Sequence, residues 1–224
     1  MTPATSDKAY KGMGMEGFTA RWYASLTLKS LDEFKSLARR IAGTIPHGSA
    51  VLEVAPGPGY CAIELAKLDC DSITGLDISR SFVSIARDNA ERAGVAVDFR
   101  QGDAAHMPFP DQSFDFLLCR AAFKNFTHPV QALQEMYRVL KPGGRALIID
   151  LRKDATMDSI NQAVGAMHLN SVNRVLTRLT FRFVLLKRAY TRKDFERMLA
   201  QTKFGPIDIQ QGLIGFELWL DRTA

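Results

Sequence analysis

The stretch VLEVAPGPGY, residues 51–60, decides the fold, because an apolar run reaches an acid and then breaks into prolines and glycines. Residues 51–54 have the β-branched and apolar content of a buried strand, whereas Pro56 and Pro58 fix φ and stop the ladder from continuing. Small apolar residues then recur at a helical period over residues 62–68. This order of strand, glycine loop and helix predicts a nucleotide-like ligand at the carboxyl end of the strand.

The glycine loop does not by itself say which adenosine ligand is bound. Gly57, Gly59 and Ala62 satisfy the dinucleotide fingerprint G-x-G-x-x-G/A, and Asp77 stands where an acid that binds ribose would be expected. Glu53 at the strand end would be a poor neighbour for a pyrophosphate but suits a ligand with an ammonium and a sulfonium. The residues therefore favour S-adenosylmethionine. A nicotinamide dinucleotide, or a tight turn that Glu53 merely caps, stays open as an alternative.

Composition indicates a globular protein with a single domain. The 224 residues are 46% hydrophobic and 24% charged, without a low-complexity linker. No apolar run approaches the about 18 residues of a membrane span, and the polar start MTPATSDKAYKG has no leader-like core, so we expect a cytoplasmic protein. Cys61, Cys70 and Cys119 lack C-x-x-C spacing, which predicts reduced thiols and no metal site. The net charge of +5 is mostly dispersed, so no nucleic-acid partner is expected.

Acids recur at the ends of the predicted strands. Glu53 ends the first strand, Asp77 ends the second at residues 72–77, and Asp103 follows a third that begins near Val95. A fourth strand over residues 113–120, a helix from Pro129 and a fifth strand over residues 145–151 complete the pattern. Strands and helices alternating in this way predict a mostly parallel, doubly wound α/β sheet, whose carboxyl edge would hold the three acids together.

Residues 1–26 carry a high density of aromatic side chains ahead of the first strand, including Tyr10, Trp22 and Tyr23. Such side chains need a surface to cover, so we expect either an arm over the ligand end of the sheet or simple packing against the first helix. Ser30 and Glu33 have the spacing of a capping box at the start of that helix.

Four segments together resemble the class I S-adenosylmethionine-dependent methyltransferases over about residues 47–151. They are VLEVAPGPGY, GLDIS at 75–79, QGDAAHMPFPDQSFD at 101–115 and LKPGGRALIID at 140–150. AAFKNF at 121–126 is similar to the loop after strand four in the ubiquinone/menaquinone C-methyltransferases. The resemblance implies a seven-stranded Rossmann-like sheet that ends in a reversed hairpin, which residues 204–214 and 215–220 fit.

The resemblance also assigns roles at the cofactor. It implies that Gly57 and Gly59 approach the methionine part, that Asp77 binds the ribose hydroxyls and that Asp103 receives the adenine amino group. Two departures stand out, because Ala55 replaces the usual first glycine and Lys124 replaces the usual arginine of the quinone enzymes. The full expected cofactor set is Glu53, Ala55, Gly57, Gly59, Asp77, Ile78, Asp103, Ala104 and Arg120.

The segment after the fifth strand is expected to choose the methyl acceptor. We divide the single domain into residues 1–46 (arm and first helix), 47–151 (cofactor core), 152–190 (a helical lid insertion) and 191–224 (last helix and hairpin). Within the insertion, residues 174–188 form a basic amphipathic element with arginines at 174, 178 and 182 opposite apolar residues. That face could lie in water, bind an acidic substrate or contact an anionic membrane surface.

The predicted function is methyl transfer by in-line displacement to a small, apolar or aromatic metabolite. Orienting the partners in a dry pocket supplies much of such a rate, so a dedicated base is optional. Lys124, Asn125 and His168 are the candidates to orient or deprotonate the acceptor. The alternatives are a nicotinamide-dependent oxidoreductase and a ligand-binding protein of the same fold that does not catalyse transfer. The sequence does not indicate an oligomeric state.

Overall fold

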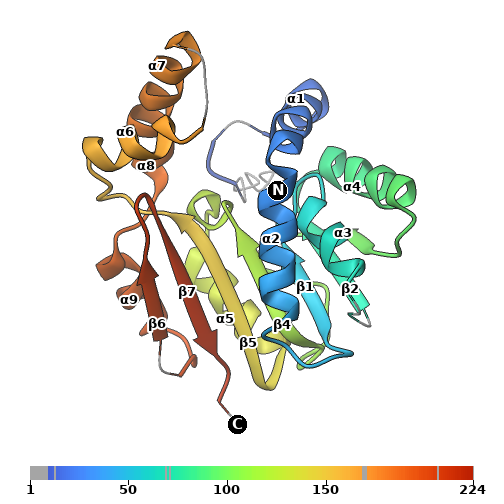
Figure 1. Cartoon of the computed structure of the whole chain (residues 1–224). Helices are drawn as coiled ribbons and strands as arrows, with labels where there is room; N and C mark the ends of the chain where they lie inside the picture. The colour runs from blue at the N-terminus through green and yellow to red at the C-terminus, as the bar shows by residue number, and fades with distance from the viewer. Residues whose placement is uncertain are drawn as a thin grey trace, which may run out of the picture.

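A seven-stranded sheet with the order β3-β2-β1-β4-β5-β7-β6 forms the centre of the computed structural model (Figure 1). The structure describes residues 10–12, 14–68, 70, 72–167, 171–205 and 207–223. Strands β1 to β5 pair in parallel, and β7 runs antiparallel to β5 and β6, as the predicted fold class requires. The strands are β1 (Ala50–Val54), β2 (Ser72–Asp77), β3 (Asp98–Gln101), β4 (Phe114–Arg120), β5 (Leu140–Leu151), β6 (Ile207–Gln211) and β7 (Gly215–Asp221).

The starts of β3 and β5 differ from the sequence prediction. β3 begins at Asp98, later than expected from the alternating residues before it, because its pairing with β2 starts there. β5 begins at Leu140, which pairs with Phe114 before the register shifts to Arg145 opposite Phe116. The intervening Lys-Pro-Gly-Gly sequence therefore interrupts the pairing of β5 without ending it.

Helices cover both faces of the sheet, as doubly wound chains require. One buried cluster joins α2 (Leu31–Ala42), α3 (Tyr60–Ala66) and α4 (Arg80–Ala93) to Val51, Phe116 and Leu147. The opposite cluster joins α5 (Pro129–Val139) and α9 (Arg192–Leu199) to the alternate strand residues. Neighbouring residues of one strand thus enter different cores, which fixes the register. The other helical elements are α1 (Gly17–Thr27), η1 (Leu28–Ser30), η2 (Phe123–Asn125), α6 (Met157–Gly165), α7 (Ser171–Thr180), the π-helical η3 (Phe181–Leu185) and α8 (Leu186–Arg188).

Side chains cap the starts of α4 and α9. Ser79 accepts a hydrogen bond from the amide of Phe82 at the start of α4, and Thr191 with Asp194 forms a capping box at α9. The predicted capping box at Ser30 is wrong, since its side chain makes no capping bond. Ser30 ends η1 with ψ of 22°, outside the extended region that a capping residue needs.

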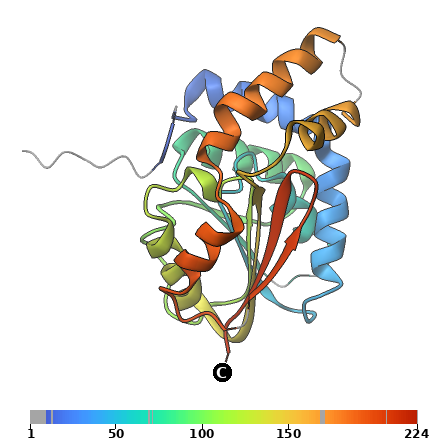
Figure 2. The ribbon, with the colours of Figure 1, turned by 90° about the vertical axis from the view of Figure 1, so that its left-hand side faces the viewer.

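The arm and the insertion both stand at the carboxyl end of the parallel strands. Figures 1 and 2 show α1 and the group α6–α8 beyond that end of the sheet, on either side of the middle strands. A small core of Ile160, Val164 and Leu186 holds the insertion together. In the described part of the chain, no helix has the length and apolar character to cross a membrane.

Candidate functional site

The candidate site lies where β1, β2 and β4 end, at the point where strand order reverses. Asp77, at the end of β2, is buried and fixes two loops with one carboxylate. Its Oδ2 accepts from the amide of Gly57 at 3.0 Å, and its Oδ1 accepts from the amide of Ser79 at 2.9 Å. Burial raises the pKa of Asp77 to about 6, although these amide hydrogen bonds lower it. Asp77 therefore positions the glycine loop in addition to facing the site.

The two loop glycines are required for different reasons. Gly57 has φ of +56°, and a Cβ placed on it would meet no atom within 4 Å, so its missing side chain leaves open space at the carboxyl edge. Gly59 has φ of +81°, but a Cβ there would lie 2.6 Å from the ring of Phe99 and 2.9 Å from Ala86. Gly59 thus permits close packing of the loop on the core, whereas Gly57 offers backbone to a ligand.

Ala55, which replaces the usual glycine, also adopts a left-handed conformation, with φ of +57°. Its amide donates to the carbonyl of Leu76 at 2.7 Å, which ties the end of β1 to β2. An L-residue pays roughly 1–2 kcal/mol for this conformation, and alanine is the smallest side chain that can tolerate it. The departure from the family pattern therefore keeps the glycine-like backbone at a modest cost in stability.

Glu53 is a buried carboxyl at the same edge, 3% exposed, and its Oε2 has no hydrogen-bond partner within the protein. Burial raises its pKa to about 7, and the nearby Asp77 raises it further, while the amide of Ala62 and the guanidinium of Arg120 lower it. A cation placed against the unpaired oxygen would stabilise the ionised form of this buried carboxyl. Glu53 thus fits the cationic ligand that the sequence suggested.

Changing Glu53 to glutamine should flatten the pH dependence of stability. Because the folded-state pKa is about 7 and the ordinary value is 4.5, the stability contributed by the protonated carboxyl is fully present below the ordinary pKa, falls as pH rises from 4.5 to about 7, and is gone above that. Glu53→Gln is therefore expected to match the wild type near pH 4 and to exceed it by about 3 kcal/mol above pH 8. Urea unfolding at both pH values measures the free energy of unfolding of each protein. The same difference between the two proteins at both pH values would contradict a raised pKa at Glu53.

Three residues of the expected cofactor set, Ile78, Asp103 and Ala104, lie further along the edge, after β2 and β3. Ile78 is 37% exposed, and Ala104 is half-buried against the core. Asp103 uses Oδ1 to accept from the amide of Ala105 at 2.9 Å, and its Oδ2 lies 3.9 Å from Nδ1 of His106. One aliphatic side chain, that of Ile78, is thus exposed beside a carboxylate, which suits the flat face of a ring with a polar edge.

Arg120, at the end of β4, is directed toward α2. Its guanidinium pairs with Glu33 at 3.0 Å and lies 4.5 Å from the centre of the Phe34 ring. Its charge also lowers the pKa values of Glu53 and Tyr23. Arg120 therefore acts on the expected cofactor site through its field, while its side chain packs against the helix.

Lys124 has a structural environment that the sequence did not indicate. It is 5% exposed, and its Nζ lies 2.9 Å from Oδ1 of Asp150 and donates to the carbonyl of Ala121. Asp150 also accepts from the amides of Lys124 and Leu151, at 2.8 Å and 2.7 Å. An ammonium held in this way joins the loop after β4 to the end of β5, and the geometry favours this role over that of a free base.

The other two catalytic candidates differ in what can be said of them. Asn125 is half-buried at the end of η2, and its carbonyl accepts from the amide of Lys11 at 2.7 Å. His168 lies outside the described residues. Within the described residues, only Lys124 and Asn125 can be placed together, in one turn at the carboxyl edge.

The N-terminal segment crosses this edge. Tyr10 bridges to Phe126 after η2, whereas Glu16 accepts from the amides of Arg80 and Ser81 at the start of α4, both at 3.0 Å. Because η2 follows β4 and α4 follows β2, the segment between them passes the end of β1, the strand that carries the glycine loop. Burial raises the pKa of Tyr10 and of Tyr23, and the field of Asp77 reaches both.

Sequence reasoning missed Asp150, Lys11 and Glu16 as parts of this site. Asp150 ends β5 as Glu53 ends β1, so the signal of strand-end acids could have found it. Lys11 donates from Nζ to the hydroxyl of Tyr190 at 2.9 Å, a contact across 179 residues that no local pattern announces. Such distant contacts need the tertiary structure.

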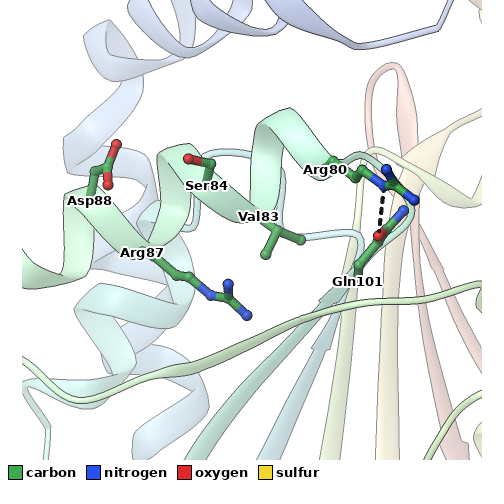
Figure 3. A pocket seen from close by; sticks show the side chains of 6 residues that line it. All are labelled: Arg80, Val83, Ser84, Arg87, Asp88 and Gln101. Atoms are coloured by element: carbon green, nitrogen blue, oxygen red, sulfur yellow. Dashed lines mark hydrogen bonds between the residues drawn. The ribbon is translucent and has the colours of Figure 1, made fainter.

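A separate surface hollow of about 410 Å³ lies between α4 and β3 and is drawn in Figure 3. Arg80 and Gln101 are joined across it by a 3.2 Å hydrogen bond, and Arg87 donates to the carbonyl of Phe99. No residue of the expected cofactor set lines it. The hollow is therefore beside the candidate site and is not the cofactor cradle.

The cofactor core is similar to known methyltransferases. The family model described as a methyltransferase domain matches residues 52–148. A demethylmenaquinone methyltransferase of Deinococcus radiodurans is 39% identical over 107 residues, which cover 47% of this chain and 44% of that protein. A ubiquinone/menaquinone biosynthesis C-methyltransferase of Pseudomonas fluorescens is 33% identical over 136 residues, which cover 58% of this chain and 53% of that protein. This chain thus spans about half the length of the curated relatives it matches.

The similarity of fold extends further than the similarity of sequence. A crystal structure from Methanococcus maripaludis with the methyltransferase fold matches with a TM-score of 0.73 over 96% of each chain. The identity is 21%, so this match supports the fold alone. The structural match extends beyond residues 52–148, where the family model ends, and covers 96% of this chain.

Proposed function

We propose, from the premise that residues 52–148 form a class I S-adenosylmethionine-dependent methyltransferase domain, that this protein methylates a small aromatic acceptor of the quinol type. The observation that carries the proposal is the open space at Gly57 beside two buried acids, Glu53 and Asp77. Exposed backbone beside two carboxylates suits the hydroxyls of a ribose and the positive charge of a methionine sulfonium and ammonium. The same carboxylates would repel a pyrophosphate.

The acceptor class rests on two supports. The relatives that align with the core are named for demethylmenaquinone and for ubiquinone/menaquinone biosynthesis. The arm and the insertion add apolar and aromatic side chains at the same end of the sheet, which suits a lipophilic ring.

In the proposed mechanism, S-adenosylmethionine supplies an electrophilic methyl group on a sulfonium. Asp77 holds the glycine loop and would receive the ribose hydroxyls, while an ionised Glu53 would balance the positive charge of the methionine part. The segment around Tyr10 excludes water from the edge, and the Lys124–Asp150 pair fixes the loop that carries Asn125. The rate arises mainly from orientation of the two partners.

The test is transfer of an isotope-labelled methyl group from S-adenosylmethionine to a panel of reduced quinones and phenols. We expect release of S-adenosylhomocysteine with a labelled aromatic product, identified by mass spectrometry. Cofactor binding without release of S-adenosylhomocysteine across the panel would refute transfer to this class of acceptor. Transfer to a non-aromatic metabolite from a cell extract would keep the enzyme class and replace the acceptor.

A further inference from the structure

Exposed large apolar side chains gather at one end of the described molecule. Most belong to two groups of elements, α1 with η1 and α6 to η3. Figures 1 and 2 show that α1 and the α6–α8 group stand on opposite sides of the middle strands. The remaining two, Ile78 and Leu213, follow β2 and β6 at this same end. The full set is Phe18, Trp22, Leu26, Leu28, Ile78, Met157, Met167, Val175, Leu176, Leu179, Phe183, Val184 and Leu213. Exposed apolar residues usually scatter singly, so their collection at one end indicates a contact surface.

The outer side of α7 and η3 is apolar. Leu176 and Phe183 are 56% and 53% exposed, whereas Arg174 and Arg178 are half-buried toward the protein. The sequence had left open a simple solvated arginine face, and the structure turns the apolar face outward instead. A helix whose apolar side faces outward, with basic residues along its flanks, is typical of an element that lies in a membrane interface.

The positive charge of the chain is concentrated in this region. Residues 157–188 contain five of the 29 Lys and Arg and one of the 24 Asp and Glu. This stretch therefore carries four of the five net positive charges of the chain. Arg21 and Lys29, both exposed on α1 and η1, add positive charge on the other side of the same end.

We propose that this end, comprising α1, η1 and residues 157–188, docks on an anionic lipid bilayer. Basic side chains would contact the headgroups while Trp22, Leu176 and Phe183 enter the boundary of the acyl chains. A second copy of the chain would oppose like charges across a two-fold interface, which disfavours self-association. A nucleic acid would match the charge and leave the aliphatic side chains without a partner. The proposal is independent of the methyl transfer proposed above.

Co-sedimentation with lipid vesicles tests the docking surface. The full chain is mixed with vesicles of phosphatidylcholine alone or with one third phosphatidylglycerol, at low and high ionic strength, without cofactor or acceptor. We expect binding to the anionic vesicles, a loss of binding at high salt and little binding to the neutral ones. Emission from Trp22 should be quenched by lipids that carry bromine in their acyl chains.

Two charge-reversal variants separate the surface from net charge. Arg182→Glu/Lys187→Glu alters two exposed residues of the proposed surface and should weaken partitioning by roughly 30-fold or more. Arg92→Glu/Lys203→Glu changes the net charge equally at exposed positions outside the proposed surface, and binding should persist within a few-fold. Leu176→Ser/Phe183→Ser keeps the charge and should also reduce binding, because the apolar contact is lost.

Loss of vesicle binding in Arg182→Glu/Lys187→Glu and in Leu176→Ser/Phe183→Ser, but not in Arg92→Glu/Lys203→Glu, supports docking at this end. Absence of vesicle binding, an equal loss in both charge-reversal variants, or full binding by Leu176→Ser/Phe183→Ser would overturn the proposal, since each removes the specific role of this surface. Light scattering that shows a dimer broken by Leu176→Ser/Phe183→Ser would overturn it in favour of self-association. Circular dichroism of each variant confirms that the fold is retained.

Discussion

A Gly57→Val variant is expected to bind S-adenosylhomocysteine about 100-fold more weakly than the wild type, or worse, a loss of about 3 kcal/mol. Gly57 has φ of +56° and faces open space, so a branched side chain would stand where the methionine part of the ligand is expected. The left-handed backbone should also lower the free energy of unfolding by roughly 1–2 kcal/mol. Isothermal titration and urea unfolding measure the two effects separately.

Gly94→Val provides the matched control. Gly94 has φ of +68°, and a Cβ on it also meets no atom within 4 Å, but it caps the far end of α4. The backbone cost should therefore be similar to that at Gly57, while cofactor binding stays at the wild-type level. If both variants lose affinity equally, the effect at Gly57 reflects loss of stability and not occupation of the cradle.

Lys124→Met should lower the free energy of unfolding by about 3–5 kcal/mol, because it leaves the buried carboxylate of Asp150 without its ion-pair partner. Lys141→Met is the matched control, since Lys141 pairs with Asp115 at 2.8 Å with the two side chains 42% and 33% exposed. That change should cost less than about 1 kcal/mol. Urea unfolding of both variants measures the difference.

Lys124→Arg separates a structural role from a proton-accepting one. Arginine restores a cation beside Asp150 but cannot act as a base near neutral pH. Recovery of turnover with Lys124→Arg would support the structural role. A stable Lys124→Arg variant that binds cofactor and has no turnover would instead assign the acceptor proton to Lys124.

The local signals of the cofactor core were strong enough to predict its fold. The sequence from Val51 to Tyr60 combines strand formers, prolines and glycines, each with one dominant backbone consequence, and the observed β1, glycine loop and α3 follow it. Strand-end acids at Glu53 and Asp77 were placed correctly because parallel strands end at one edge. The prediction for Ser30 was wrong because Ser30 is the last residue of η1, and its backbone there is not extended as a capping residue requires. The spacing of Ser30 and Glu33 carries no information about a preceding 3-10 turn.

The parts of the site that depend on long-range contacts could not be predicted in this way. The environment of Lys124 depends on Asp150, which lies 26 residues later, and the N-terminal segment reaches Tyr190 through Lys11. In the insertion, the helical pattern indicated an amphipathic element but not which side would face outward. That choice depends on the packing of Leu186 and Ile160, which form the small core beneath it.

The central claim is that the carboxyl edge around Gly57 and Asp77 binds an S-adenosyl cofactor. Isothermal titration of the wild-type chain with S-adenosylhomocysteine, and separately with NAD, tests it most directly. We expect saturable binding of one S-adenosylhomocysteine per chain, lost in Gly57→Val and kept in Gly94→Val, with no heat from NAD. Saturable binding of NAD together with no response to S-adenosylhomocysteine would contradict it.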